Sequence, residues 1–128
     1  MQIQTKLFSW PDKGNHILMV ARGLLDARGL RQVLNEVSVM AIQHLNCKVL
    51  IDFIDADCNV DPREIERLFY EPRPDLWPRE YKIALVSSSR HDQYSRLLLV
   101  HTSLVSHGFR IAVFRDAKAA VEWLAHEN

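Results

Sequence analysis

The stretch VLIDFIDADCNVDPREIERLF, residues 49–69, contains the pattern that decides the fold. It begins with VLIDF, an apolar run of the length and composition of a buried strand. Four aspartates follow or end that run, and PREIERLFY at 62–70 then reads as a helix. The segment therefore predicts a strand, an acid-rich turn and a helix, in that order.

Three residues mark the start of this helix. Asp61 is expected at the N-cap, Pro62 at the first helical position, where no amide hydrogen is needed, and Glu64 two residues later. Such a cap contributes about 0.5–2 kcal/mol. Asp61 is thus explained by helix stability alone.

The other three aspartates have the same kind of explanation. Asp52 can accept backbone amide hydrogen bonds at the end of its strand, and Asp55 and Asp57 are predicted to be turn residues. The alternative is a divalent metal bound by carboxylate oxygens, although the spacing matches no calcium loop. We expect no metal and no cofactor.

The strand-then-helix pattern recurs twice downstream. YKIALVS at 81–87 precedes HDQYSRLLLVHTSLVSH at 91–107, and FRIAVFR at 109–115 precedes AKAAVEWLAHE at 117–127. Gly108 is expected to end the first of these helices and Asp116 to start the second. Alternation of strands and helices predicts right-handed crossovers and a mainly parallel sheet. No linker or low-complexity tract interrupts the chain, so a single domain over residues 1–128 is expected.

Upstream of residue 49 the pattern is different. The alternating segment QIQTKLF at 2–8, the turn residues PDKG at 11–14 and the strand HILMVAR at 16–22 predict a β-hairpin. An amphipathic helix follows, with Asp26 placed to cap it. The expected fold is α/β: this hairpin leads into a mainly parallel five-stranded sheet with four helices.

Alternate positions of the predicted strands differ in character. One set is uniformly large and apolar: Ile17, Met19, Val49, Ile51, Phe53, Ile83, Leu85, Ile111 and Val113. The other set is smaller and polar at the strand ends. Because successive side chains point to opposite faces of a sheet, we expect helices mostly on the first face. The second face is expected to be partly open to a partner or ligand, although cover on both faces would also fit.

Composition excludes some partners and favours one compartment. Sixteen basic and sixteen acidic residues cancel, so neither nucleic acid nor an anionic membrane surface is favoured. No apolar run approaches the roughly 20 residues that span a bilayer, and no signal-peptide pattern is present. Cys47 and Cys58 lack a zinc-site or redox spacing, and Cys58 is expected to lie in an exposed turn. These features favour the cytoplasm.

Polar residues precede the helix at 91–107. The serines of SSSR at 87–90, Ser88 among them, are expected to cap that helix, with Asp92 in its first turn. The alternative is an anion held by the serine hydroxyls, the helix start and Arg90. No glycine-bearing elbow accompanies the serines, so a nucleophilic triad is not predicted. Only convergence of Asp52, Asp57, Ser88 and His101 in one polar pocket would favour an enzyme, and we expect none.

The segment EPRPDLWPRE at 71–80 contains three prolines and is expected to be extended. Trp77 within it either folds back onto the domain or contacts a partner, since tryptophan is enriched at protein contacts. Val39 and Ile42 fall off the apolar stripe of their helix and form a small patch that could serve self-association.

Three segments together resemble the STAS domains and the related SpoIIAA-like group: VARGLLDARGLRQVLNEV at 20–37, VLIDF at 49–53 and FRIAVFRDAKAAVEWL at 109–124. The resemblance implies a SpoIIAA/STAS-like superhelix of strand-helix units. In anti-sigma factor antagonists of this family, a serine at the start of the helix after the third strand is phosphorylated by a partner kinase. That position falls at or near Asp61, which either imitates the phosphorylated state or only caps the helix.

We therefore predict a non-enzymatic STAS-like module for protein interaction or regulation that lacks the phosphorylatable serine. Its expected partner-binding residues are Asp57, Asp61, Ser88, Arg90 and Trp77. A protein partner or a second copy of the chain is expected to bind there. The alternative is a carrier or sensor of a small apolar or acyl ligand, because the same superhelical fold occurs in lipid-carrying domains.

Overall fold

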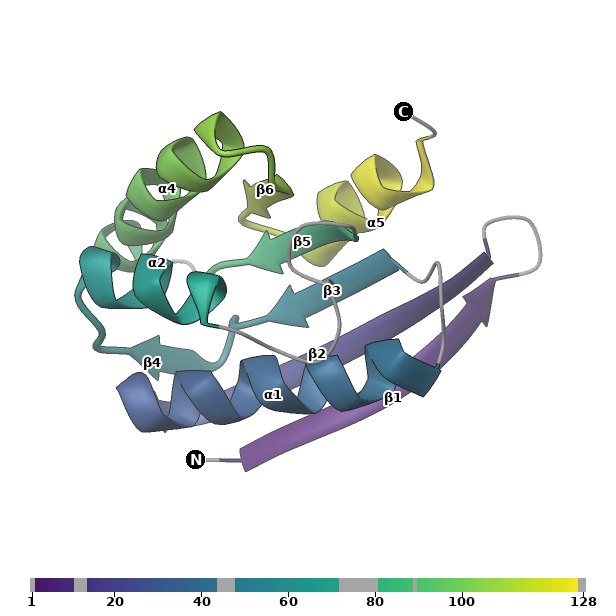
Figure 1. Cartoon of the computed structure of the whole chain (residues 1–128), viewed down its shortest axis with the longest axis horizontal. Coiled ribbons are helices and arrows are strands. Elements are labelled where there is room, and N and C mark those ends of the chain that lie inside the picture. The colour runs from purple at the N-terminus through teal and green to yellow at the C-terminus, as the bar shows by residue number, and fades with distance from the viewer. Residues whose placement is uncertain (1, 11–13, 44–47, 72–80, 89, 127–128) are drawn as a thin grey trace.

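A twisted sheet with helices on both faces forms the centre of the structure (Figure 1). The computed structural model describes residues 2–10, 14–43, 48–71, 81–88 and 90–126. The strands are β1 (Gln2–Trp10), β2 (Gly14–Leu25), β3 (Lys48–Asp52), β4 (Ala56–Cys58), β5 (Lys82–Val86) and β6 (Arg110–Phe114). The helices are α1 (Ala27–Gln43), α2 (Pro62–Tyr70), α4 (His91–Ser106) and α5 (Ala117–Ala125).

The strand order confirms the hairpin and the mainly parallel sheet. The main path runs β1-β2-β3-β5-β6, with β1 and β2 antiparallel and the other neighbours on this path parallel. The short strand β4 lies off this path and pairs in parallel with the end of β2. The five expected strands are thus present, and β4 is an addition to them.

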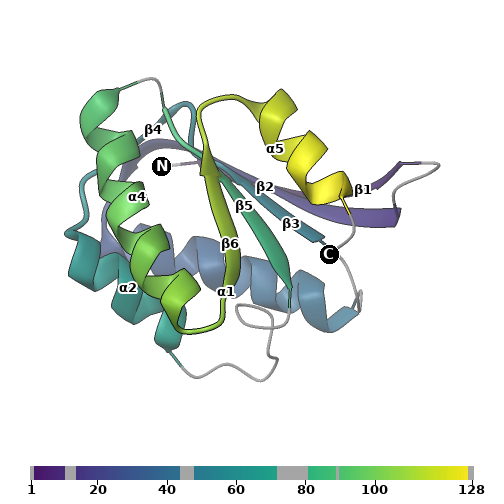
Figure 2. The ribbon, with the colours of Figure 1, turned by 90° about the horizontal axis from the view of Figure 1, so that it is seen from above.

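The two faces of the sheet have separate cores, as the alternation of side chains predicts. Helices α1, α2 and α4 cover the face with the large apolar set, and the buried cluster there includes Ile17, Ile51 and Leu85. Helix α5 lies on the opposite face, where it packs on a smaller cluster of Leu50, Ala84, Val86, Ala120 and Leu124 (Figure 2). The prediction of helices mostly on one face is confirmed.

Local capping signals are also confirmed. Asp26 Oδ1 accepts a hydrogen bond of 2.9 Å from the Gly29 amide at the start of α1, and Asp116 Oδ1 accepts one of 2.8 Å from the Ala119 amide in α5. Gly108 follows the end of α4 with φ of 92°, a left-handed conformation that residues with a Cβ rarely adopt.

Lys82, at the start of β5, fixes the end of α5. It is buried, and its Nζ donates hydrogen bonds of 2.6 Å to the Trp123 carbonyl and 2.7 Å to the His126 carbonyl. A cation near the last carbonyls of a helix interacts favourably with its dipole. Burial lowers the pKa of this amine, and the charges of Lys48 and Arg110 add to the effect. Because Lys82 joins the start of β5 to the last turn of α5, the helix runs antiparallel to this strand.

Among the helices within the described ranges, none has the length and apolar character that a membrane span requires.

Candidate interaction surface

Three of the four aspartates have the local structural roles expected of them. Asp55 lies in the turn between β3 and β4, as predicted. Asp52 Oδ1 accepts a hydrogen bond of 2.8 Å from the Ile54 amide, which closes the turn after β3. Asp61 is the N-cap of α2, and its carboxylate accepts one of 2.9 Å from the Arg63 amide. The predicted helix cap at Asp61 is confirmed. No group of three or more histidine, cysteine or acidic side chains suited to a metal occurs in the described part of the chain.

Asp57 is not a turn residue, and that prediction is wrong. It is the middle residue of β4, where Ala56 and Cys58 are buried in the larger core and Asp57 is half-exposed. Burial also contradicts the expected exposure of Cys58, whose thiol has a raised pKa because desolvation opposes its charged form. Cys47 lies outside the described residues.

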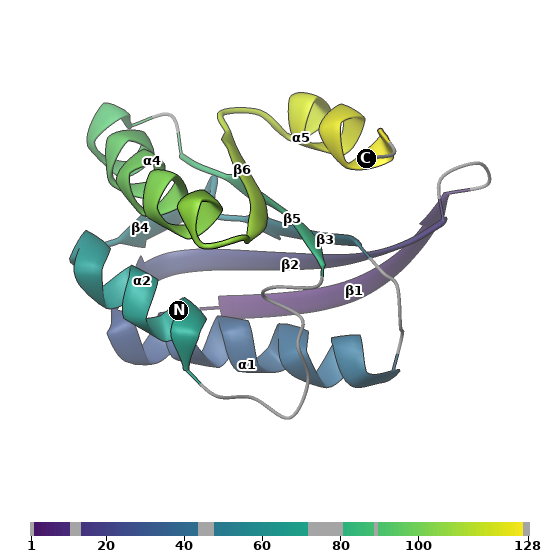
Figure 3. The same ribbon diagram turned by 45° about the horizontal axis from the view of Figure 1, so that its top comes forward.

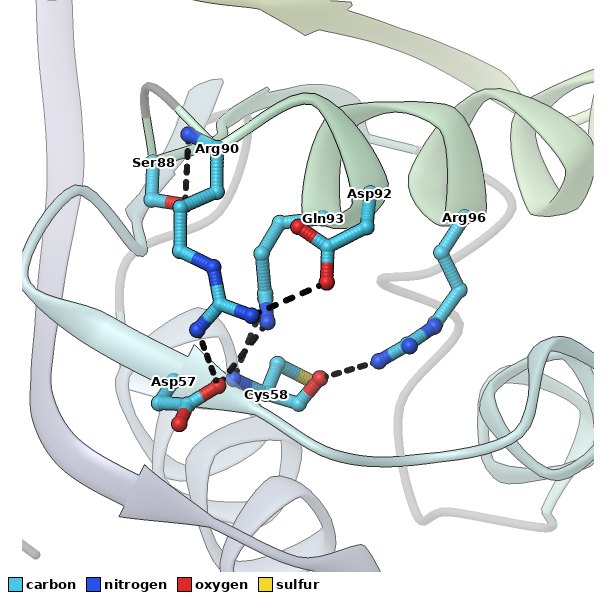
Figure 4. A network of polar contacts seen from close by, with 7 residues as sticks. All are labelled: Asp57, Cys58, Ser88, Arg90, Asp92, Gln93 and Arg96. Atoms are coloured by element: carbon cyan, nitrogen blue, oxygen red, sulfur yellow. Dashed lines mark hydrogen bonds and ion pairs between the residues drawn. The ribbon is translucent and has the colours of Figure 1, made fainter.

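Side chains of α4 bind the free edge of β4. The Cys58 amide donates a hydrogen bond of 3.1 Å to Gln93 Oε1, and the Cys58 carbonyl accepts one from Arg96 Nη1 (Figure 4). Strand β2 pairs with the other edge of β4, as the hydrogen bond from the Asn59 amide to the Leu25 carbonyl shows. Gln93 and Arg96 therefore take the place of a further strand, which protects an edge that would otherwise be available for pairing.

A chain of charges extends from β4 to the start of α4. Arg90 lies 3.2 Å from Asp57 and 3.0 Å from Asp92, and Gln93 Nε2 donates a 3.0 Å hydrogen bond to the same Asp57 oxygen (Figure 4). Desolvation acts to raise the pKa of Asp92, but the charge of Arg90 and the Gln93 amide outweigh it, and the pKa is lowered. All three charged side chains are about half-exposed. We call Asp57, Arg90 and Asp92 the charged corner.

Ser88 lies beside this corner but does not cap α4. The N-cap is Arg90, without a side-chain cap, so the expected serine cap is wrong. Ser88 is buried. Its hydroxyl accepts a hydrogen bond of 3.4 Å from the Arg90 amide, and its carbonyl accepts one from the Ser87 hydroxyl. Because Arg90 already contacts two carboxylates, its charge is not directed at an anion held by the serines.

An exposed leucine, which the sequence analysis missed, lies next to the charged corner. Leu24 of β2 is 71% exposed and is the register partner of Asp57. Their neighbours Leu25 and Cys58 are buried in the larger core, so Leu24 and Asp57 point to the opposite face. The only sequence signal for the exposure of Leu24 was its position directly after Gly23 and before Leu25.

The remaining predicted residues lie elsewhere. Asp61 is part of a separate hollow of about 370 Å³ between α2 and α4, which also includes Arg63, Glu66 and Leu99. Trp77 lies outside the described residues. The structure therefore brings Asp57, Ser88 and Arg90 together, but it separates Asp61 from them.

Asp52 is one of the four residues whose convergence in one polar pocket would have favoured an enzyme. It lines a different cavity, beneath α5. The described residues around that cavity do not include Asp57, Ser88 or His101.

Comparisons with known proteins identify the fold. No family model matches the sequence, and no curated protein matches it. An uncharacterized protein of the DUF3478 family from Shewanella loihica PV-4, which has a SpoIIAA-like fold, superposes with a TM-score of 0.62 at 16% identity, over 95% of this chain and 93% of that one. The anti-sigma factor antagonist SpoIIAA in its unphosphorylated form gives a TM-score of 0.46 at 12% identity, over 94% of this chain and 97% of that one. The chain has a SpoIIAA-like fold, as its sequence predicts.

Proposed function

We propose that this chain is a non-enzymatic module that binds a partner protein through Leu24 and the charged corner. The observation that carries the proposal is the 71% exposure of Leu24 directly beside Asp57 in the β2–β4 register. A large apolar side chain next to ordered polar groups is the composition of a protein contact, in which an apolar anchor is surrounded by a polar rim.

The rigidity of the surface supports this function. Strand β4 is held on one edge by β2, through the backbone of Asp55 and Asn59, and on the other by Gln93 and Arg96, which bind the Cys58 backbone. Asp57 is therefore presented from a fixed strand. Rigid presentation lowers the ordering entropy that binding costs. Charged groups at the rim would contribute mainly to association rate and specificity, whereas Leu24 would contribute most of the affinity.

The module would not be switched by serine phosphorylation at the start of α2. Asp61 occupies the N-cap there and uses its carboxylate on the Arg63 amide. An aspartate brings one negative charge that no phosphatase removes, whereas a phosphate would add about −1.5 to −2 and could be removed. Binding would therefore be constitutive with respect to that position.

Affinity capture from a lysate of the source organism tests the proposal with matched variants. Leu24→Asp is expected to reduce the captured partner about tenfold or more, as loss of an interface anchor does. Val39→Asp is the control, because Val39 is also an exposed apolar residue, at 57%, but belongs to α1 on the other face. A partner retained equally by both variants, or the absence of any partner that discriminates between them, would refute the proposal.

A further inference from the structure

Figure 3 shows α5 on the face of the sheet opposite α1 and α2. A cavity of about 180 Å³ is lined there by residues of α5 and of the strands beneath it. We call it the α5 cavity. The described residues that line it are His16, Ile17, Leu18, Leu50, Asp52, Ala117, Val121 and Leu124. None of them belongs to the charged corner, so occupation of this cavity and the proposed partner contact are separate properties.

The two polar side chains stand at opposite ends of the α5 cavity. His16 of β2 is in register with Lys48, the first residue of β3. Asp52, the last residue of β3, is in register with Val20 of β2. Four residues of strand separate these levels, which corresponds to about 13 Å at roughly 3.3 Å per residue. Leu18 and Leu50 are register partners between them, so the floor of the cavity is apolar.

Burial shows which end is open. His16 is 2% exposed and Leu124 is fully buried, whereas Asp52 is only partly buried and Ala117 is exposed. The antiparallel direction of α5, fixed by Lys82 at its last carbonyls, brings Ala117 to the same end as Asp52. The cavity therefore opens beside Asp52 and closes around Leu124 and His16.

We propose that the α5 cavity binds a small amphiphile whose head group donates a hydrogen bond to Asp52, an alcohol or an amine. A comparable apolar cavity of about 150 Å³ holds one benzene molecule, so the body of the ligand has about six to eight non-hydrogen atoms. This body enters first and lies on Leu18 and Leu50 beneath Val121. The head group remains at the mouth.

The chemistry of Asp52 selects the head group. One carboxylate oxygen accepts the 2.8 Å hydrogen bond from the Ile54 amide, and a carboxylate has further acceptor positions but no donor when ionised. Alcohols and amines supply that donor, and an ammonium adds charge complementarity. A free carboxylic acid would bring a second negative charge against Asp52, so short fatty acids are excluded as the preferred ligand.

Three probes of equal chain length test this inference: hexylammonium, 1-hexanol and hexanoate, each titrated into ¹⁵N-labelled protein at pH 7. Hexylammonium and 1-hexanol are expected to cause saturable amide shifts centred on Leu18, Leu50 and Val121. Hexanoate is expected to bind at least about tenfold more weakly than hexylammonium. The comparison of the two donors also decides whether charge or hydrogen bonding dominates.

Variants locate the site. Asp52→Asn retains an acceptor for the Ile54 amide, so it should weaken hexylammonium about tenfold and 1-hexanol by less than about threefold. Val121→Phe fills the cavity and should abolish binding of both donors, and Ala117→Leu at the mouth should do the same if Val121→Phe does not fold. Glu122→Gln, on the exposed side of α5, is the control and should bind as the wild type does. No saturable shift with either donor, or hexanoate binding as tightly as hexylammonium, would overturn the inference.

Discussion

Replacement of Gln93 by methionine tests whether α4 holds β4 in place. Gln93 is 6% exposed; its Oε1 accepts the Cys58 amide at 3.1 Å, and its Nε2 donates to Asp57 at 3.0 Å. Methionine has a similar length and no amide group, so Gln93→Met removes both hydrogen bonds with little change in volume. The Cys58 amide would remain buried without its acceptor.

The expected cost follows from these two bonds. A buried amide left without a partner costs about 1–3 kcal/mol, and the bond to half-exposed Asp57 adds up to about 1 kcal/mol because water can replace it. The two contributions together span about 1–4 kcal/mol, and the middle of this range predicts that Gln93→Met lowers the free energy of unfolding by about 2–3 kcal/mol. For a chain of 128 residues the entropy of unfolding is about 0.27 kcal/mol/K, so the melting temperature should fall by about 7–11 °C.

Urea denaturation measures this change, with circular dichroism and tryptophan fluorescence recorded on the same samples. The m-value should equal that of the wild type, which shows that stability and not compactness has changed. Asp57→Asn is the control, because its side-chain oxygen can still accept from Gln93 and its effect should stay below about 1 kcal/mol. A Gln93→Met protein within about 0.5 kcal/mol of the wild type would refute the claim that Gln93 anchors β4.

Three further predictions concern single groups. Asp61→Ala should lower the free energy of unfolding by about 1 kcal/mol through loss of the α2 cap, and Asp61→Asn should restore most of it, as thermal melts will show. In a Cys47→Ser background, Cys58 should react with a thiol reagent more slowly in the folded than in the urea-unfolded protein, because burial raises its pKa; equal rates would show that β4 is open. Because the pKa of Asp92 is lowered in the folded state, its carboxylate stabilises the fold above the unfolded pKa of 3.8, and this contribution is lost as the pH falls through the folded pKa. Asp92→Asn should therefore flatten the pH dependence of the free energy of unfolding only on the acid side.

Those parts of the fold that depend on near neighbours in the sequence were predictable. The Asp61-Pro62 cap, the Asp116 cap and the Gly108 stop each act within one helical turn, and each has its expected role. The assignment of Ile17 and Ile51 to one face and Leu50 to the other follows from strand alternation, which needs no long-range information. These local rules were sufficient for the sheet and its four helices.

The site depended on contacts between distant segments, and much of it was missed. Strand β4 has only three residues, and its pairing with the extension of β2 to Leu25 overrides the turn character of Asp57. That pairing buries Cys58 and exposes Leu24. Gln93 lies 35 positions beyond Cys58, so nothing local in the sequence indicated that it would bind the β4 edge.

Photo-crosslinking from position 24 in cells of the source organism tests the central claim most directly. A photoreactive phenylalanine at Leu24 should capture one dominant partner protein, and the same group at Val39 should not. Loss of this product when Arg90→Glu is added would place the contact at the charged corner. Identical products from positions 24 and 39, or none from position 24, would contradict the claim that Leu24 and its charged neighbours form a partner-binding surface.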